Sequence, residues 1–105
     1  MPKPTAKPLT LPKIWTETTN TALNYERLFA LGERKVRVRI HAESYPSQSY
    51  GRADVFDPAA NQWNPLAAIP GPLLKADHYA GRGDPLAFDA DVNILLAESA
   101  MIFGA

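Results

Sequence analysis

The clearest hydrophobic pattern in the chain is the strict alternation of residues 35–43, which read Lys-Val-Arg-Val-Arg-Ile-His-Ala-Glu. Val36, Val38, Ile40 and Ala42 fall on one side of an extended chain, and the charged or polar residues fall on the other. Alternation with β-branched residues is typical of a strand that buries one face. Residues 35–43 are therefore predicted to form a half-buried strand.

The segment before this strand ends at Gly32-Glu33. Gly32 suits the first central position of a two-residue hairpin turn, so residues 25–31 are predicted to be the partner strand. A helix over residues 20–31 that stops at Gly32 is the alternative, because its apolar positions fit helical spacing tolerably. We favour the hairpin, since it gives strand 35–43 an immediate neighbour.

A second hairpin is predicted between residues 49 and 69. Residues 49–56 form one strand, 57–62 a turn-rich connection and 63–69 the other strand. Pro65 lies inside the last strand, and a proline there requires an edge position or a bulge.

Residues 54–70 also contain Phe56-Asp57-Pro58, Asn61, Trp63, Leu66 and Pro70 in that order. This order resembles one hairpin of a kelch repeat, in which an aromatic-Asp-Pro run precedes Asn, Trp, Leu and Pro. A propeller needs four or more blades, and the chain has one copy of the pattern. The resemblance therefore implies a well-formed hairpin and no propeller.

The chain ends in a predicted helix that either Asp89 or Asp91 can cap and that Gly104 ends. Its apolar stripe at helical spacing consists of Val92, Leu95, Leu96, Ser99, Ile102 and Phe103. Seven aromatic residues are assigned to the core: Trp15, Tyr25, Phe29, Phe56, Trp63, Phe88 and Phe103. The predicted fold class is α+β, a four-stranded antiparallel meander of two hairpins packed by one C-terminal helix.

The ends and loops of the chain complete the predicted organisation. Residues 1–13 contain four prolines and three lysines and are predicted to form a flexible, extended N-terminal arm. Residues 14–105 are predicted to form a single α+β domain, as expected for 105 residues. Residues 44–48 and 75–87 are predicted to be loops.

The amino-acid composition mainly excludes classes of functional site. The absence of cysteine excludes disulfides, zinc-thiolate sites, iron–sulfur clusters and thiol catalysis. Eleven basic and eleven acidic residues balance, which argues against a surface built wholly for nucleic acid or anionic lipid. The charges are nevertheless unevenly distributed, since the N-terminal part of the chain is basic and the C-terminal part is acidic. No long apolar segment is present, so we expect a cytoplasmic location and no membrane partner, and no cofactor is predicted.

The charged side of strand 35–43 is the first candidate site. It predicts a nucleic-acid-binding surface in which cations contact phosphates and nearby tyrosines offer stacking surface. The residues concerned are Lys35, Arg37, Arg39, His41, Tyr45 and Tyr50. The simpler interpretation is a solvated sheet face whose charges pair with Glu26 and Glu33 across the strands. We favour that interpretation, because the net charge is zero and RNA-binding sheets usually carry aromatic residues on the strands themselves.

A second candidate is a metal or acid–base site at His41, Glu43 and His78. His41 and Glu43 share a strand face, and His78 would join them if its loop folded over the strand. No ligand motif or catalytic motif is complete, so a surface histidine beside a carboxylate is the simpler interpretation. The chain is accordingly predicted to be non-enzymatic.

The predicted helix carries more apolar surface than one buried stripe needs. Ile94 and Met101 lie away from that stripe, which indicates self-association, or else cover by the arm or by the loop over 72–87. The leading hypothesis is therefore a small binding or regulatory domain that acts through protein–protein contacts as a homodimer. Nucleic-acid binding and a metal-centred role are the alternatives.

Overall fold

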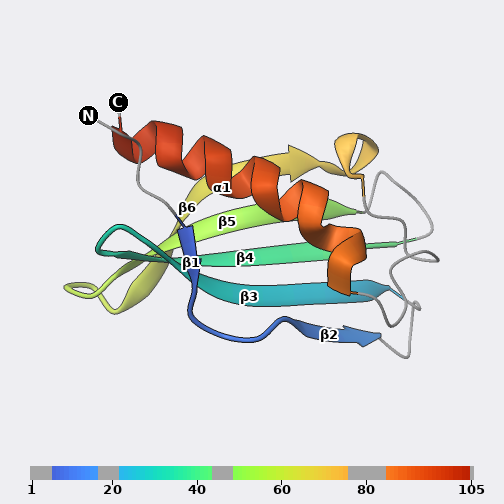
Figure 1. Cartoon of the computed structure of the whole chain (residues 1–105), viewed down its shortest axis with the longest axis horizontal. Helices are drawn as coiled ribbons and strands as arrows, with labels where there is room; N and C mark the ends of the chain where they lie inside the picture. The colour runs from blue at the N-terminus through green and yellow to red at the C-terminus, as the bar shows by residue number, and fades with distance from the viewer. Residues whose placement is uncertain (1–5, 17–21, 44–48, 76–84, 105) are drawn as a thin grey trace.

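The computed structural model describes residues 6–16, 22–43, 49–75 and 85–104. One antiparallel sheet is crossed on one face by a single helix (Figure 1). The elements are β1 (Ala6–Pro8), β2 (Lys13–Thr16), β3 (Leu23–Leu31), β4 (Arg34–Ala42), β5 (Tyr50–Asp57), β6 (Gln62–Pro70), the short 3-10 turns η2 (Gly71–Leu73) and η3 (Pro85–Phe88), and α1 (Asp89–Gly104). The α+β class predicted from the sequence is confirmed.

The sheet has six strands where the sequence predicted four. Its order is β1-β3-β4-β5-β6. β2 also pairs with β3, at residues 23–26, whereas β1 pairs with β3 at residues 29–31. β1 and the first residue of β2 lie within 1–13, the segment predicted to be an arm. Leu9 N donates to Leu28 O at 2.8 Å, and Leu28 N donates to Thr10 Oγ1 at 3.0 Å. These bonds satisfy the outer edge of β3, and prolines are tolerated there because an edge strand leaves some N–H positions unused.

The turn between β3 and β4 explains why residues 23–31 form a strand and not the alternative helix. Gly32 has a φ of 65°, a backbone conformation that favours glycine. It lies at the first central position of the two-residue turn, as predicted. β3 and β4 then pair along their whole length, from Leu31 opposite Arg34 to Leu23 opposite Ala42.

The second hairpin contains both features that Pro65 was predicted to require. β6 is an edge strand, and its pairing with β5 shifts by one residue, so that Ala53 faces Ala67 but Asp54 faces Pro65. Leu66 is therefore the extra residue of a β-bulge.

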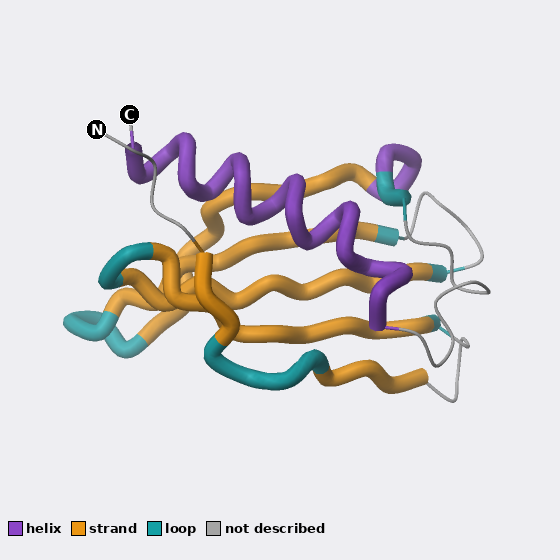
Figure 2. Tube along the Cα trace, viewed as in Figure 1, coloured by secondary structure: helices purple, strands orange, loops and turns teal. Residues whose placement is uncertain are grey.

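One face of the sheet packs under α1 and forms the core (Figure 2). The helix buries Asp91, Val92, Leu95, Leu96, Ser99 and Ala100. Ile102 was predicted to lie in the buried stripe but is 51% exposed. The buried side of α1 passes through Ser99 and Ala100, and Ile102 lies outside it. A Cβ added at Gly51 on β5 would lie 3.2 Å from Leu74 Cδ2, which is tighter than ordinary contact, and 3.4 Å from Leu95 Cδ1, so the missing side chain makes room chiefly for Leu74.

Three of the seven aromatic residues assigned to the core are buried there: Tyr25, Phe29 and Phe88. Phe103 is half-buried against the core. Trp15, Phe56 and Trp63 lie instead on the other face of the sheet, as described below. No helix in the described part of the chain has the length and apolarity needed to cross a bilayer.

Candidate functional site: the open face of the sheet

The sheet face that α1 does not cover, here called the open face, collects the charged side of β4. Residues that pair across antiparallel strands point to the same side of a sheet, so the register defines this face row by row. One row is Trp15, Asn24, His41, Tyr50 and Pro70. The next is Lys13, Glu26, Arg39, Arg52 and Ala68. The third is Leu28, Arg37, Asp54 and Pro65, and the fourth holds Ala30, Lys35, Phe56 and Trp63.

Aromatic side chains lie at the two ends of the open face. Trp15, which is 39% exposed, and Tyr50 belong to the first row, and the half-buried Phe56 and Trp63 belong to the last. Rows are two residues apart, so the two aromatic ends are separated by roughly 20 Å along the strands. Three residues that the sequence assigned to the core are thus surface aromatics.

The bulge at Leu66 explains the position of Trp63. Without the extra residue, Trp63 would fall on the helix side of β6, because a one-residue shift moves every side chain to the opposite face. With it, Trp63 faces Phe56, and the two ring centroids are 5.2 Å apart. The bulge therefore converts a core position into a surface one.

Cations occupy the rows between and beside these aromatics. β2, β4 and β5 place five of them on the open face, namely Lys13, Lys35, Arg37, Arg39 and Arg52, whereas β3 and β5 place two carboxylates there, Glu26 and Asp54. The formal charge of this part of the face is positive although the whole chain is neutral.

Asp54 organises the centre of this surface. One of its oxygens, Oδ2, accepts from Arg37 Nη2 at 3.4 Å and from Arg39 Nη2 at 3.2 Å. The Asp54 side chain is 8% exposed, whereas those of Arg37 and Arg39 are 20% and 38% exposed. A buried carboxylate thus holds two guanidinium groups side by side, and the pairing with Glu26 and Glu33 expected from the sequence is replaced by pairing with Asp54.

The Nε atoms of Arg37 and Arg39 are buried and have no hydrogen-bond acceptor among the described residues. A ligand on the open face would therefore meet the Nη groups of these arginines. Each of these buried Nε–H groups carries a desolvation cost, since no described acceptor replaces the water that it has lost.

Four cation–π contacts join the charged and aromatic residues of the open face. Arg37 lies 4.5 Å from the Trp63 ring centroid and Arg52 lies 4.6 Å from that of Tyr50. The other two contacts are Lys13 over Trp15 at 5.2 Å and Lys35 over Phe56 at 5.6 Å. Such contacts hold long side chains in place and orient positive charge beside an exposed ring.

His41 is held by three neighbours. Its Nδ1 lies 2.8 Å from Asn24 Oδ1, its Nε2 lies 2.9 Å from Glu43 Oε1, and its ring stacks on Tyr50 with centroids 5.2 Å apart. Since a carboxylate only accepts, Nε2 donates to Glu43. His41 and Glu43 are thus brought together as predicted, whereas His78 lies outside the described residues. Within the described ranges, no group of three His, Asp, Glu or Cys side chains could hold a metal ion.

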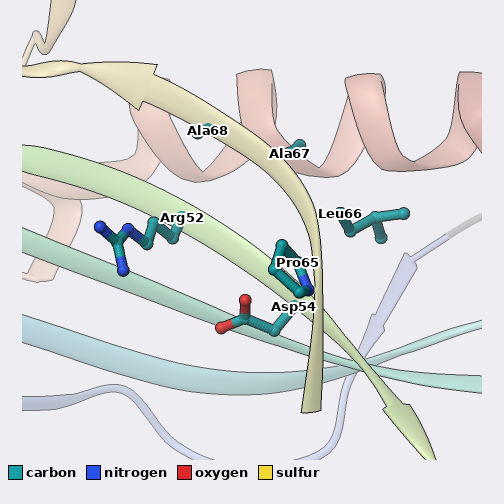
Figure 3. Close-up of a pocket in the computed structure, with 6 residues that line it drawn as sticks. All are labelled: Arg52, Asp54, Pro65, Leu66, Ala67 and Ala68. Atoms are coloured by element: carbon teal, nitrogen blue, oxygen red, sulfur yellow. The ribbon is translucent and has the colours of Figure 1, made fainter.

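Two hollows open beside the cations. One, of about 450 Å³, lies between the β1–β2 connection and Trp63 and is lined by Thr10, Leu11, Lys13, Glu26, Arg27, Leu28, Arg37 and Trp63. The other, of about 460 Å³, lies at the bulge and is lined by Arg52, Asp54, Pro65, Leu66, Ala67 and Ala68 (Figure 3). Both fall within the size range of small-ligand pockets, and both combine apolar walls with a guanidinium group.

The structure thus places five of the six residues predicted for nucleic-acid binding on one face: Lys35, Arg37, Arg39, His41 and Tyr50. Tyr45 lies outside the described residues. Sequence reasoning missed Arg52, Asp54, Phe56, Trp63 and Trp15. The alternation of residues 50–56 could have predicted that Arg52, Asp54 and Phe56 share a face with Tyr50. The positions of Trp63 and Trp15 on the open face could not be predicted in this way, because they depend on the bulge at Leu66 and on the added strand β2.

Compared with known families, curated proteins and solved structures, the chain shows no match.

Proposed function

We propose that the protein is a binding module that holds single-stranded nucleic acid on the open face of its sheet. The observation that carries this proposal is the presence of cations and aromatic rings on the same face, with charged rows between two aromatic ends. Strands that bind single-stranded nucleic acid combine a positive track for the phosphates with rings on which bases stack. The sequence ranked this function second, because the net charge is zero and because RNA-binding sheets usually carry aromatic residues on the strands themselves.

Single strands fit this face better than a duplex. The rings of Trp15, Tyr50, Phe56 and Trp63 can stack only on bases whose faces are free, and the bases of a duplex are stacked on each other. The face also presents no helix or protruding hairpin among its described elements that would enter a major groove. Phosphates would be neutralised by Lys13, Lys35 and Arg52, while Arg37 and Arg39 stay anchored to Asp54.

The test is binding of a fluorescent oligonucleotide of about 12 nucleotides, as RNA and as DNA, measured by anisotropy from about 50 to about 500 mM salt. We expect binding that weakens as salt rises. The variant Lys35→Glu/Arg52→Glu should lose affinity by about tenfold or more, and its salt slope should be smaller by about 1.4, since two phosphate contacts are lost at about 0.7 each on a single strand. A matching duplex should bind more weakly than the single strand.

The matched control is Arg34→Glu/Lys75→Glu, which changes the net charge equally. Arg34 lies over the Phe103 ring near the end of α1, 4.0 Å from its centroid, and Lys75 follows η2, so neither belongs to the rows of the open face. Equal loss in both variants would mean that net charge alone controls binding, and the assignment to the open face would be wrong. Absence of salt-dependent binding to either nucleic acid would overturn the proposal.

A further inference from the structure

The hollow between the β1–β2 connection and Trp63, here called the Trp63 hollow, combines apolar walls with a few polar groups. Its volume is about 450 Å³, and Leu11, Leu28 and the indole ring of Trp63 supply apolar surface. Leu11 is 84% exposed, more than any other large apolar side chain among the described residues. A flat ring system placed in the hollow would cover Leu11 and remove apolar surface from water.

One wall of the hollow is fixed before any ligand binds. Thr10 in the β1–β2 connection is tied to β3 by two hydrogen bonds. Its Oγ1 accepts from Leu28 N at 3.0 Å, and its carbonyl oxygen accepts from Arg27 Nε at 2.8 Å. These bonds hold the connection against β3 although it is not part of a strand. A pocket that is formed in advance loses less conformational entropy when it binds.

Glu26 is the acceptor of the hollow, and its carboxylate has no ion-pair or hydrogen-bond partner among the described residues. It is half-buried on β3, directly opposite Lys13 on β2 and Arg39 on β4. The other carboxylate of the open face, Asp54, is already engaged by Arg37 and Arg39. Glu26 is therefore the carboxylate that a ligand on this face can use.

We propose that the Trp63 hollow takes a guanine base of the bound strand, whose N1–H and N2 amino group donate to the carboxylate of Glu26. This selectivity rests on the function proposed above and adds the identity of one base to it. A carboxylate only accepts hydrogen bonds, and guanine is the common base whose Watson–Crick edge presents two neighbouring donors. The third group of that edge, O6, accepts from Lys13 or Arg37, which line the same hollow.

The other common bases present an unfavourable pattern to Glu26. Uracil and thymine place one N–H between two carbonyl oxygens, and adenine and cytosine place an amino group beside a ring nitrogen that only accepts. A carboxylate next to any of these acceptors is repelled where guanine would donate a second hydrogen bond. Selectivity therefore follows from the donor pattern of the base and not from the size of the hollow.

The first test compares strands that differ at one base. The probes are a fluorescent strand of about 12 uridines, the same strand with one central guanosine, and the same strand with inosine there, whose base lacks the N2 amino group. By anisotropy, guanosine should tighten binding about tenfold over uridine, and inosine should lose about threefold of that gain. Equal affinity of the three strands would overturn the selectivity.

Glu26→Gln separates base recognition from the general effect of charge. The change removes a negative charge from the open face, so affinity for the uridine strand should rise. The amide replaces one acceptor oxygen by a donor, so the preference for guanosine should fall to about twofold or less. Glu33→Gln is the matched control, since exposed Glu33 lies in the turn between β3 and β4, and it should keep the full preference. A full preference in Glu26→Gln would contradict the role of Glu26.

Guanosine monophosphate tests the hollow without a strand. The two tryptophans give two indole N–H signals in an NMR spectrum, and Trp63 lines the hollow whereas Trp15 does not. Added from about 0.1 to about 5 mM, guanosine monophosphate should shift the Trp63 signal more than the Trp15 signal, and adenosine monophosphate should shift both less. The side chains of Ile94 and Met101, 37% and 56% exposed on α1, are on the other side of the sheet, and their signals should stay unchanged.

The two experiments distinguish the guanine site from the function on which it rests. Strands that bind without preference for guanosine would contradict the guanine site alone. A shift of the Trp63 signal by guanosine monophosphate, in a protein that binds no strand, would contradict the proposed function and support a site for a guanine nucleotide. Shifts at Trp15 or Met101 in place of Trp63 would contradict the hollow as the place of binding.

Discussion

Arg37 on β4 lies 4.5 Å from the ring centroid of Trp63 on β6, across the strand between them. The contact ties the charged centre of the open face to one of its aromatic ends. It exists because the bulge at Leu66 turns Trp63 away from the core. A cation over this half-buried indole ring forms a platform for an unstacked base, which would lie against the ring beside the positive charge.

Both tryptophans of the chain, Trp15 and Trp63, lie on the open face, so nucleic-acid binding there should change the intrinsic fluorescence. We expect quenching that saturates with added oligonucleotide. Trp15→Phe and Trp63→Phe should each retain binding and separate the contributions of the two ends. Trp63→Ala removes a stacking surface and should weaken binding by about fivefold or more. Anisotropy changes without any change in tryptophan emission would contradict binding at this face.

Asp54→Asn should have opposite effects on stability and on binding. The change removes the carboxylate that holds Arg37 and Arg39, so the free energy of unfolding should fall by about 1–3 kcal/mol. It also releases two guanidinium groups and removes one negative charge, so the affinity for a single-stranded oligonucleotide should rise at low salt. Urea unfolding and anisotropy give the two numbers. Weaker oligonucleotide binding by folded Asp54→Asn would show that the paired geometry itself is needed.

Tyr25 makes the protein sensitive to alkali. Burial raises the pKa of its phenol above the ordinary value of 10.0, while the neighbouring Arg27 acts in the opposite direction. A raised pKa in the folded state means that the unfolded chain releases this proton first. Stability should therefore be unaffected by this group below about pH 9 and should fall as the pH rises above about 10.

Tyr25→Phe is the control for this pH dependence. Phenylalanine keeps the ring that stacks on Phe88 at 5.0 Å between centroids but cannot ionise. Its unfolding free energy, measured with urea from about pH 8 to about pH 11, should decline less steeply than that of the unchanged chain. Identical slopes for the two proteins would assign the alkaline loss to other groups.

Asp91 fastens the segment after β6 to the first turn of α1. It is fully buried, and its Oδ1 accepts a hydrogen bond from Lys75 N at 2.8 Å. Asp91→Ala leaves that N–H without this acceptor and should cost about 1–3 kcal/mol in urea unfolding. Asp91→Asn keeps an acceptor oxygen and should cost less, although it loses the favourable charge at the helix start. Equal losses would mean that charge, and not the hydrogen bond, is what matters.

Local signals predicted the parts of the fold that local physics determines. The alternation of residues 35–43, the turn at Gly32 and the helix that begins at Asp89 are each specified by neighbours in the sequence. β1 could not be predicted in this way, because a short segment rich in proline and lysine becomes a strand only when the edge of β3 is available to pair with it.

The sequence analysis predicted the candidate site on one strand, although the alternation of residues 50–56 carried a signal for a second. Lys35, Arg37 and Arg39 follow from period two, but their partner Asp54 follows from the register between β4 and β5. The aromatic ends required still more, since Trp63 reaches the open face through a bulge whose position Pro65 marks but does not fix. An aromatic residue in a half-buried strand is usually assigned to the core. Here that assumption assigned Trp15, Phe56 and Trp63 to the wrong face of the sheet.

Among the described elements, the open face carries more cations than carboxylates, whereas α1 bears only acidic charges and has Arg34 against its last turn, so these two surfaces form an electric dipole across the sheet. A polyanion approaching from solution is attracted to one side of the protein and repelled from the other. Encounters are thereby pre-oriented before any contact forms. The collisions that reach the surface will begin, in most cases, with the correct side facing the ligand, and this advantage in association rate will vanish as added electrolyte screens the dipole.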